Sequence, residues 1–285
     1  MALPPMRCAT QVISYTPGTG AGLSYQQPAS ALGPPARMTG TGSEAGAVTP
    51  FRPAYLPEQV VSVGRGGALV LAFDEPVTDD PAHPFGVDLI VYGNAMFGDL
   101  AYPAGAPGYL FDEGGIVELS ADGVEWRTVP GAVADGGLPT MGFVDLGPYA
   151  PGPGAEPTDP AWPVDPAVTP DSLAWMDYES VVAAYGGGAG GTNIDLASVG
   201  LASARFVRIR VPTDAAWVPE IDAVVAVRAA AVAGDLDGDG DVDGADLGAL
   251  LGSWGPCACA ADLDGDGAVT GADLGILLGA WGTQP

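Results

Sequence analysis

The chain of 285 residues has no lysine and a single histidine, and its nine basic residues, all arginine, face 35 acidic ones. The formal net charge is therefore −26 at pH 7. A surface this negative repels phosphate backbones and anionic lipid headgroups, which excludes nucleic acid as a partner and makes membrane surfaces poor ones. Multivalent cations are the natural counterpart of such a charge.

The scarcity of histidine also limits catalysis. The one histidine, His83, lies in the Pro-containing segment DDPAHPFG, where we expect it to be an exposed loop residue. This removes most Ser-His and Cys-His hydrolase machinery, and the sequence contains no G-x-S-x-G or H-E-x-x-H motif. Paired carboxylates for glycoside hydrolysis stay open, because their separation of about 5–9 Å is not visible in a sequence. We therefore expect a protein that is not an enzyme.

Long apolar runs are lacking as well. The longest, Ala223 to Ala233, is interrupted by Arg228 and falls short of the ~18–20 residues of a spanning helix, so no transmembrane segment is expected. Residues 1–9 lack the basic and apolar regions of a signal peptide. The features below indicate a location outside the cell or on its surface. We therefore expect residues 1–9 to be a leader remnant, left by a misplaced start or by trimming.

Cysteine is rare, with only Cys8, Cys257 and Cys259 in the chain. An odd number without a C-x₂-C pair fits neither a zinc site nor a disulfide framework. Cys257 and Cys259 are close enough in sequence for a local bridge, and two free thiols are the alternative.

Glycine and proline are abundant, with 44 and 28 residues, alongside a hydrophobic fraction of 47%. Turn-rich all-β structure reconciles these values. No helical pattern of 10–15 residues separates the apolar runs, and an Asp-Gly turn at 122–123 predicts a hairpin. We expect residues 10–229 to form an antiparallel, jelly-roll-like β-sandwich. Its strands are predicted at Val12–Tyr15, Ala68–Phe73, Val87–Tyr92, Ile116–Ser120, Val124–Arg127, Phe206–Val211 and Ile221–Val227.

Three stretches interrupt or end this pattern. Residues 147–170 are dense in proline and predict a long surface loop, and residues 186–192, GGGAGGT, predict a flexible one. Residues 229–234, rich in alanine, predict a short linker. The linker leads into a small C-terminal domain, residues 230–285.

This C-terminal domain contains two near-copies of one acidic segment, Asp235–Gly255 and Asp262–Gly282. Seventeen of their 21 positions are identical, and their period is 27 residues. Each copy opens with D-x-D-G-D-G and has another Asp at its twelfth position. Ca²⁺ takes about six to eight oxygen ligands, and its loop needs converging carboxylates and a glycine at the sharp turn. The spacing therefore predicts two Ca²⁺ loops, 235–246 and 262–273.

The loop pattern assigns ligands to positions one, three, five, seven, nine and twelve. Position seven acts through its main-chain carbonyl, and position nine acts directly or through water. In the first loop the ligands are Asp235, Asp237, Asp239, Asp241, Asp243 and Asp246. In the second they are Asp262, Asp264, Asp266, Ala268, Thr270 and Asp273.

Apolar residues follow each loop at helical spacing. We expect the two resulting helices to stack about a pseudo-twofold axis, because neither can bury its apolar stripe alone. The stripes are Leu247, Leu250, Leu251 and Trp254 in the first repeat and Leu274, Leu277, Leu278 and Trp281 in the second.

The paired loop-plus-helix repeats resemble a dockerin, from about Gly234 to Gly282. The resemblance implies folding around two Ca²⁺ ions and binding to a cohesin-like or other surface protein. Dockerins usually carry recognition residues at loop positions ten and eleven, which here are Gly-Ala in both repeats. The resemblance therefore supports Ca²⁺ binding more strongly than binding to a cohesin-like protein.

The remaining segments ALGPPAR, GGALVLAFDEPV, DLIVYGN, VELSADGVEW, RFVRIRV and EIDAVVAV resemble a bacterial exported cell-surface family with a discoidin or galactose-binding-like jelly roll. The resemblance implies a non-catalytic module whose loops bind a carbohydrate or a protein. Aromatic residues available to stack on sugar rings, or else to pack internally, are Trp126, Trp162, Trp175, Trp217 and Tyr102.

Polar residues on or beside the strands have two interpretations. They cap turns or face solvent, or some of them bind a structural Ca²⁺ at the end of the sandwich, because a buried carboxylate must be paired or bind metal. They are Asp74, Asp88, Asn94, Glu118, Glu220 and Asp222.

Together these features favour a secreted or cell-surface, non-enzymatic modular protein. Its sandwich would recognise a carbohydrate or surface protein, and its Ca²⁺-binding tail would dock it on a larger assembly. An extracellular polysaccharide hydrolase or lyase carrying a dockerin module is the alternative. A structural surface-layer component is a third.

Overall fold

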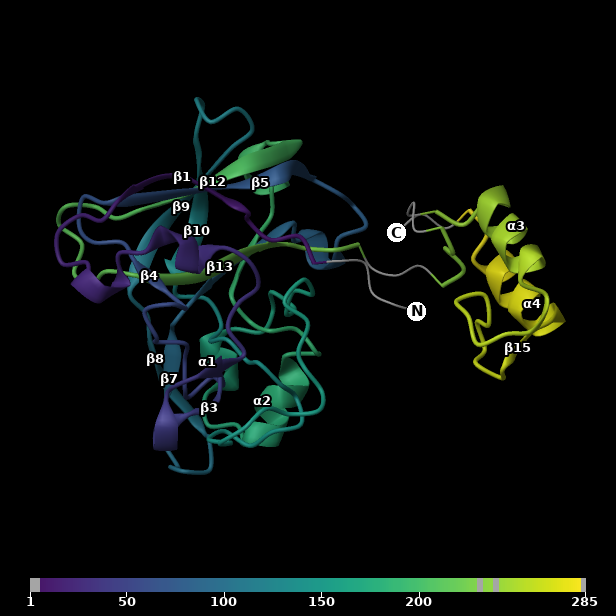
Figure 1. Cartoon of the computed structure of the whole chain (residues 1–285), viewed down its shortest axis with the longest axis horizontal. Helices are drawn as coiled ribbons and strands as arrows, with labels where there is room; N and C mark the ends of the chain where they lie inside the picture. Colours follow the sequence, from purple (N-terminus) through teal and green to yellow (C-terminus); the bar gives the residue numbers. More distant parts are fainter. Residues whose placement is uncertain (1–5, 230–232, 238–240, 283–285) are drawn as a thin grey trace. The chain divides into compact units, whose positions relative to one another are not determined.

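The computed structural model describes residues 6–229, 233–237 and 241–282. They divide into two compact units. The larger consists of Met6–Asp79 and Val87–Arg228, and the smaller contains the C-terminal tail together with residues 80–86. Strands predominate in the larger unit and helices in the tail (Figure 1).

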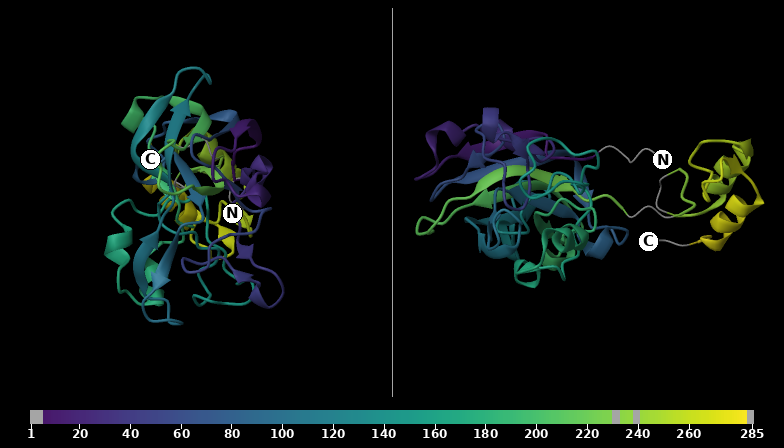
Figure 2. Two further views of the ribbon diagram at one scale, coloured as in Figure 1. Left: turned by 90° about the vertical axis from the view of Figure 1, so that its left-hand side faces the viewer. Right: turned by 90° about the horizontal axis from the view of Figure 1, so that it is seen from below.

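Two antiparallel sheets form the larger unit (Figures 1 and 2). The first contains, in spatial order, β1 (Gln11–Thr16), β5 (Ala68–Thr78), β12 (Ser203–Arg210), β9 (Gly114–Ser120) and β10 (Arg127–Asp135). The second contains β11 (Thr192–Ile194), β6 (Leu89–Gly93), β13 (Glu220–Ala226) and β4 (Val61–Ser62). Apart from the β9–β10 hairpin, neighbours within each sheet are far apart in sequence, and every pair of neighbours is antiparallel. The predicted antiparallel, mainly β fold is therefore confirmed.

The main core lies between these two sheets. Leu71 of β5 and Ile209 of β12 face Leu89 of β6 and Val224 of β13 in one buried cluster. Successive residues of a strand point to opposite faces, so the alternate residues of β12 leave this core. Arg208 and Arg210 thus lie on the outer face of the first sheet, as the alternation in the sequence predicts.

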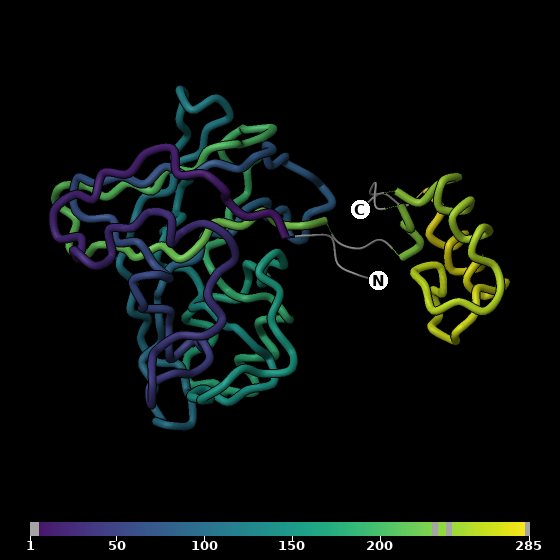
Figure 3. Tube along the Cα trace, viewed as in Figure 1, coloured from purple at the N-terminus to yellow at the C-terminus, as the bar shows by residue number. Residues whose placement is uncertain are grey.

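The second sheet is buried on its outer face too. Ile90 and Tyr92 of β6 and Val225 of β13 pack there with Ala161 and Ala189 from two long connections. Within residues 147–170, whose path Figure 3 shows, the part around Ala161 therefore covers the sheet, whereas residues 151–157 and 165–170 are mostly exposed, as the predicted surface loop requires. The Gly-rich connection at 186–192 is likewise packed, and Gly188, Ala189 and Gly190 are buried.

Glycine is required in that second connection for a steric reason. A Cβ on Gly191 would lie 2.5 Å from the Ile90 side chain, and one on Gly190 would lie 2.4 Å from the Pro139 carbonyl oxygen. Both glycines also have positive φ, which other residues adopt at a cost. The glycine-rich sequence at 186–192, which predicted flexibility, therefore reflects close packing of the backbone.

A further core lies beyond the sheets. It joins Phe97 of the hairpin β7 (Met96–Asp99) and β8 (Pro107–Phe111) to Leu173 of α1 (Pro170–Leu173) and Val181 of α2 (Tyr178–Ala184). Figure 1 shows both helices on the same side of the unit as this hairpin. The sequence analysis predicted none of these four elements. The remaining short elements are the pair β2 (Met38–Thr39) and β3 (Gly46–Ala47) and the 3₁₀ turns Leu23–Tyr25, Pro28–Ala31, Gly42–Glu44, Pro84–Gly86 and Ala197–Val199.

Three local predictions can be compared with the structure. The hairpin at 122–123 is present, since β9 pairs with β10, but β10 begins at Arg127 instead of Val124. Asp122 accepts N–H bonds from Val124 and Glu125, which extends the turn. His83 is only 9% exposed, so the prediction of an exposed loop residue was wrong.

Residues 6–9, which we assigned to a leader remnant, lie against the second sheet. The Arg7 carbonyl accepts the Ala226 N–H at 2.8 Å, and Ala9 is 1% exposed in the main core. No helix within the described residues is long and apolar enough to cross a membrane.

The tail consists of α3 (Gly244–Gly252), β14 (Gly255–Pro256), β15 (Ala268–Val269) and α4 (Gly271–Gly279). β14 and β15 pair antiparallel and join the two repeats. Val242, Leu250, Val269 and Leu277 form its small core. Each helix begins at the tenth position of its acidic loop, at Gly244 and Gly271, and continues beyond the loop, so the helix predicted after each loop is present.

Candidate metal centres

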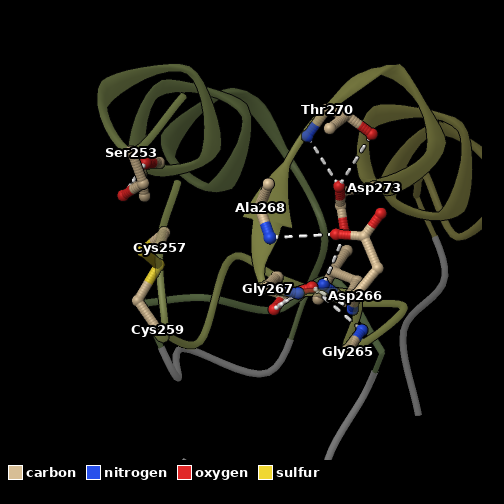
Figure 4. The surroundings of a disulfide bond; sticks show 12 residues. Ser253, Cys257, Cys259, Gly265, Asp266, Gly267, Ala268, Thr270 and Asp273 are labelled. Atoms are coloured by element: carbon tan, nitrogen blue, oxygen red, sulfur yellow. Dashed lines mark hydrogen bonds between the residues drawn. A yellow bond between two sulfur atoms is a disulfide. The ribbon is translucent and has the colours of Figure 1, made fainter. Parts of the chain in front are cut away.

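The second tail loop is organised by the carboxylate at its twelfth position. Asp273 is fully buried; its Oδ1 accepts the N–H groups of Leu263 at 2.7 Å and Asp264 at 3.2 Å. Its Oδ2 accepts the N–H of Thr270 at 2.7 Å (Figure 4). One carboxylate therefore holds the beginning of the loop against the beginning of α4.

The first loop repeats this arrangement. Asp246 is fully buried, its Oδ1 accepts the Leu236 N–H at 2.6 Å, and its Oδ2 accepts the Asp243 N–H at 2.8 Å. The two loops thus share one architecture as well as one sequence pattern. Asp239, predicted as the ligand at position five, lies outside the described residues.

The predicted ligands converge in both loops. Carboxylate oxygens of Asp235, Asp237 and Asp246 lie within 4.8 Å of one another, and so do those of Asp262, Asp264 and Asp273. Two oxygens that each bind one Ca²⁺ at about 2.4 Å cannot be more than about 4.8 Å apart. The positions one, three and twelve therefore fit a hard divalent cation, which the all-oxygen donor set also favours.

The other predicted ligands have local roles in the structure. Asp243 and Thr270 cap the N-termini of α3 and α4, where their side chains accept the N–H groups of Ala245 and Ala272. Asp266 accepts the Ala268 N–H at 2.9 Å. Asp241 joins Asp243 and Asp246 in a second group of close carboxylates. The carbonyl-ligand roles of Asp241 and Ala268 stay predictions.

The pKa values of the two twelfth-position carboxyls are shifted in the opposite direction from that of Asp264. Burial raises the pKa of Asp246, but several N–H donors lower it more, so its carboxyl lies below its usual range. For Asp273 the Thr270 N–H is the largest of several influences, and the pKa is likewise lowered. The Asp266 N–H lowers the pKa of Asp264, but burial and the charges of Asp266, Asp273 and Asp262 together outweigh it, so the pKa is raised. A bound cation would relieve this repulsion.

The apolar stripes are only half buried by the stacking of the two helices. Leu250 and Leu277 are fully buried, and Leu247 and Leu274 pack against them. The rest of each stripe faces solvent, contrary to the prediction: Leu251 is 51% exposed, Trp254 52%, Leu278 51% and Trp281 46%. Helices of nine residues present too little surface to cover each other's whole stripe. The uncovered residues form equivalent exposed pairs in the two repeats.

The two tail cysteines are bridged. Cys257 and Cys259 form a disulfide with a Cα–Cα distance of 5.3 Å, beside the second loop (Figure 4). Of the two alternatives that the sequence leaves open, the structure contains the local bridge. The Cys257 N–H donates to the Gly267 carbonyl, so the bridge also borders the β14–β15 pair.

The polar residues singled out in the sandwich are dispersed. Asp74 is exposed and accepts bonds from Thr10 and Gln11. Asp88 is buried and accepts the Leu196 N–H, and it approaches Asp79 and Asp195. These residues have separate structural roles.

Glu118 and Asp222 are buried in different ways. Glu118 is 6% exposed and binds Arg208 and Arg210 across the outer face of the first sheet. Asp222 is 2% exposed and accepts the Ala36 N–H, and burial raises its pKa to about 7. Glu118 thus forms ion pairs with two arginines of β12, and Asp222 holds the segment around Ala36 against β13.

Glu220 belongs to a cluster that the sequence analysis missed. Carboxylate oxygens of Glu113, Asp135 and Glu220 lie within 4.8 Å of one another. Burial is the main cause that raises the pKa of Asp135 to about 7 and that of Glu220 to about 9, and the Glu113 carboxyl adds to both. The only shared sequence signal is that Glu113 and Asp135 each precede a Gly-Gly pair.

A pocket of about 490 Å³ borders this cluster. Glu113 and Asn94 contribute to its wall, together with Asp112 and the aromatic side chains of Phe111 and Trp217. Trp217 is 66% exposed and Phe111 48%. Exposed aromatic faces beside polar groups are the surfaces on which sugar rings bind.

The other candidate aromatic residues do not gather there. Trp126 lies under Arg208, whose guanidinium carbon is 4.1 Å from the ring centroid, and Trp162 lies near Arg228. Tyr102 makes an edge contact with Tyr149, and Trp175 is 75% exposed elsewhere. Of the five predicted stacking residues, Trp217 alone lines this pocket.

Comparison with known proteins gives no family for this chain. No protein-family model matches it, and no curated protein sequence matches it.

Proposed function

We propose that the chain is a non-catalytic, modular protein of the cell surface or the extracellular space. Its tail binds two Ca²⁺ ions and attaches the protein to a cohesin-like or other surface protein. Its sandwich, which we assign to the jelly-roll type, recognises a carbohydrate. The dockerin-like identity of the tail is part of the same proposal.

One observation carries the Ca²⁺ assignment: the same three loop positions converge in both repeats. Asp262, Asp264 and Asp273 match Asp235, Asp237 and Asp246 position by position, and both triads lie within the span of one ion. Each remaining ligand comes from the same loop or from water. The ion supplies the positive charge that the ten aspartates of residues 230–285 otherwise lack, since no basic residue occurs there.

The exposed apolar residues of the tail support docking. Leu251 and Trp254, with Leu278 and Trp281, present two equivalent hydrophobic pairs on a domain with a small core. Large aromatic side chains of this kind dominate the binding energy of protein interfaces. Ca²⁺ would act indirectly by fixing the loops from which both helices start.

The pocket beside Trp217 supports carbohydrate recognition by the sandwich. Trp217 and Phe111 offer apolar ring faces, and Asn94, Asp112 and Glu113 offer acceptors and donors for hydroxyl groups. Carbohydrates combine apolar ring faces with hydroxyl edges, so both features match one ligand class. A glycan array probed with the full chain and with Trp217→Ala tests this part: equal binding by both proteins would contradict it.

The test of the tail is a Ca²⁺ titration of chelator-treated protein followed by far-UV circular dichroism. Folding and metal binding are coupled in such small sites, so we expect the helical signal to fall in chelator and to return with Ca²⁺. Asp262→Asn should weaken this recovery. The control Asp214→Asn removes an exposed carboxylate of the sandwich and should behave as the parent protein. Helical signal that is the same with and without chelator would contradict the assignment.

One observation favours the rival function, a polysaccharide hydrolase or lyase. Glu113 and Glu220 place two carboxyl groups together beside a pocket with an aromatic wall. Glycoside hydrolases act through a pair of carboxyl groups that flank the scissile bond. Release of reducing sugar from a polysaccharide panel, abolished in Glu220→Gln, would favour this function over simple recognition.

A further inference from the structure

Three acidic residues from distant parts of the sequence meet at one end of the sandwich. Glu113 precedes β9, Asp135 ends β10, and Glu220 begins β13. β9 and β10 belong to the first sheet and β13 to the second, so the cluster lies where the two sheets meet. The topology, rather than any local motif, brings these carboxylates together.

The central carboxylate is held in place by the backbone. Asp135 is 1% exposed, its Oδ1 accepts the Ala95 N–H at 2.7 Å, and its Oδ2 accepts the Glu220 N–H at 3.3 Å. Among the described residues no arginine forms an ion pair with any member of the cluster. Three carboxylates held this close repel one another unless a bound proton or a bound cation neutralises part of their charge.

A buried hydroxyl points to the same place. Ser62 of β4 is fully buried and lies opposite Glu220 in the register of the second sheet. Its Oγ lies beside the Glu220 carboxyl, whose pKa it lowers, but it makes no hydrogen bond of normal geometry within the described part of the chain. A buried oxygen without such a bond is uncommon in folded proteins and indicates a missing neighbour. It is a neutral oxygen ligand of the kind that hard cations accept.

We propose that Glu113, Asp135 and Glu220, with the Ser62 hydroxyl, form a third Ca²⁺ site, located in the sandwich and separate from the tail loops. The carboxylate oxygens lie within the span that one ion allows. All four ligands are oxygens, which suits Ca²⁺ and disfavours metals that prefer nitrogen or sulfur. Glu113 also lines the pocket beside Trp217, which gives the ion a route from solvent.

The site is tested by counting bound Ca²⁺ in the full chain by equilibrium dialysis. The parent protein should bind one more ion than Glu113→Gln at saturating Ca²⁺. Asp112→Asn is the matched control, because Asp112 lines the same pocket but lies outside the cluster. It should retain the full number of ions, and near-UV circular dichroism checks that each variant is folded. An equal count in the parent protein and Glu113→Gln would overturn the proposal.

A second measurement separates this site from the tail. A variant with Asp235→Asn and Asp262→Asn should lose the tail ions and retain one. If that variant binds no Ca²⁺ although the parent protein does, the sandwich site is refuted while the tail sites stand. If it retains one ion and Glu113→Gln in the same background removes it, the sandwich site is established whatever the tail binds.

Discussion

Gly93 lies against the carboxyl group of Asp135, so close that a Cβ on Gly93 would be 2.3 Å from Asp135 Oδ1. The residue is the last of β6, and Asp135 is the last of β10, so this contact joins the two sheets at one end. Glycine is therefore required at position 93 by the space that the carboxylate occupies.

Gly93→Ala should displace Asp135 and break its hydrogen bond with Ala95. Forced insertion of a methyl group into a packed site costs about 1–3 kcal/mol. We expect a decrease of this size in the free energy of unfolding of the larger unit, measured by denaturant titration. Gly147→Ala is the control: Gly147 is exposed, and a Cβ there meets nothing within 4 Å. Equal stability of the two variants would contradict this account of the contact.

Glu118 binds two arginines on the outer face of the first sheet. The Nε atoms of Arg208 and Arg210 lie 2.5 Å and 3.2 Å from its two carboxylate oxygens. Glu118→Gln removes the charge but keeps the shape, and we expect a loss of about 1–2 kcal/mol in unfolding free energy at neutral pH. Glu125→Gln is the control, because Glu125 pairs with Arg127 at 4.0 Å and both side chains are exposed. This substitution should change the free energy of unfolding by less than about 0.5 kcal/mol.

The same pair predicts a pH dependence. Burial raises the pKa of Glu118, but the bonds from Arg208 and Arg210 lower it more, so the folded-state pKa lies below the ordinary value of 4.5. A group whose pKa is lowered by folding stabilises the protein above its unfolded pKa, and this contribution is lost as the pH falls through the folded pKa. The stability difference between the parent protein and Glu118→Gln should therefore shrink below about pH 4.5. A constant difference down to pH 2.5 would show that the charge does not contribute.

Thiol reactivity tests the cysteine assignments. Cys8 is the one free cysteine of the described residues, and burial raises its pKa to about 11. At pH 8 only about one thousandth of it is then thiolate, the reactive form, in the folded protein. A thiol reagent should label Cys8 slowly in the native protein and rapidly in denaturant. Without reductant the denatured protein should show one thiol, and three would contradict the Cys257–Cys259 bridge.

The sequence predicted what local patterns determine. Val207 and Ile209 alternate with Arg208 and Arg210, and a strand with one buried face must follow this period of two. The convergence of the tail carboxylates is likewise local, because the predicted ligands of each loop come from twelve successive residues. Both kinds of feature follow from spacing alone.

Features that depend on distant neighbours could not be predicted in this way. The cluster of Glu113, Asp135 and Glu220 exists because three strand ends meet, and the sequence does not state the order of strands in a sheet. Ala161 is buried because Tyr92 and Val225 lie opposite it on the second sheet. The exposure of Trp254 depends similarly on how much surface the partner helix offers. In each case the sequence does not state which distant residue lies opposite, and only the tertiary structure supplies that neighbour.

Neighbouring leucines of α3 separate folding of the tail from docking. Leu250 is fully buried, whereas Leu251 is 51% exposed. A buried leucine replaced by alanine costs about 2–5 kcal/mol. Under the Ca²⁺ assignment that we propose, binding is coupled to folding, so this cost would appear in the apparent Ca²⁺ affinity. We therefore expect Leu250→Ala to weaken Ca²⁺ binding by the tail more than tenfold and Leu251→Ala to leave it nearly unchanged, as measured by calorimetric titration. Leu251→Ala should instead reduce capture of the cohesin-like or other surface protein that we propose as the tail's partner. Equal Ca²⁺ affinity in the two variants would show that folding around Leu250 is not coupled to the metal.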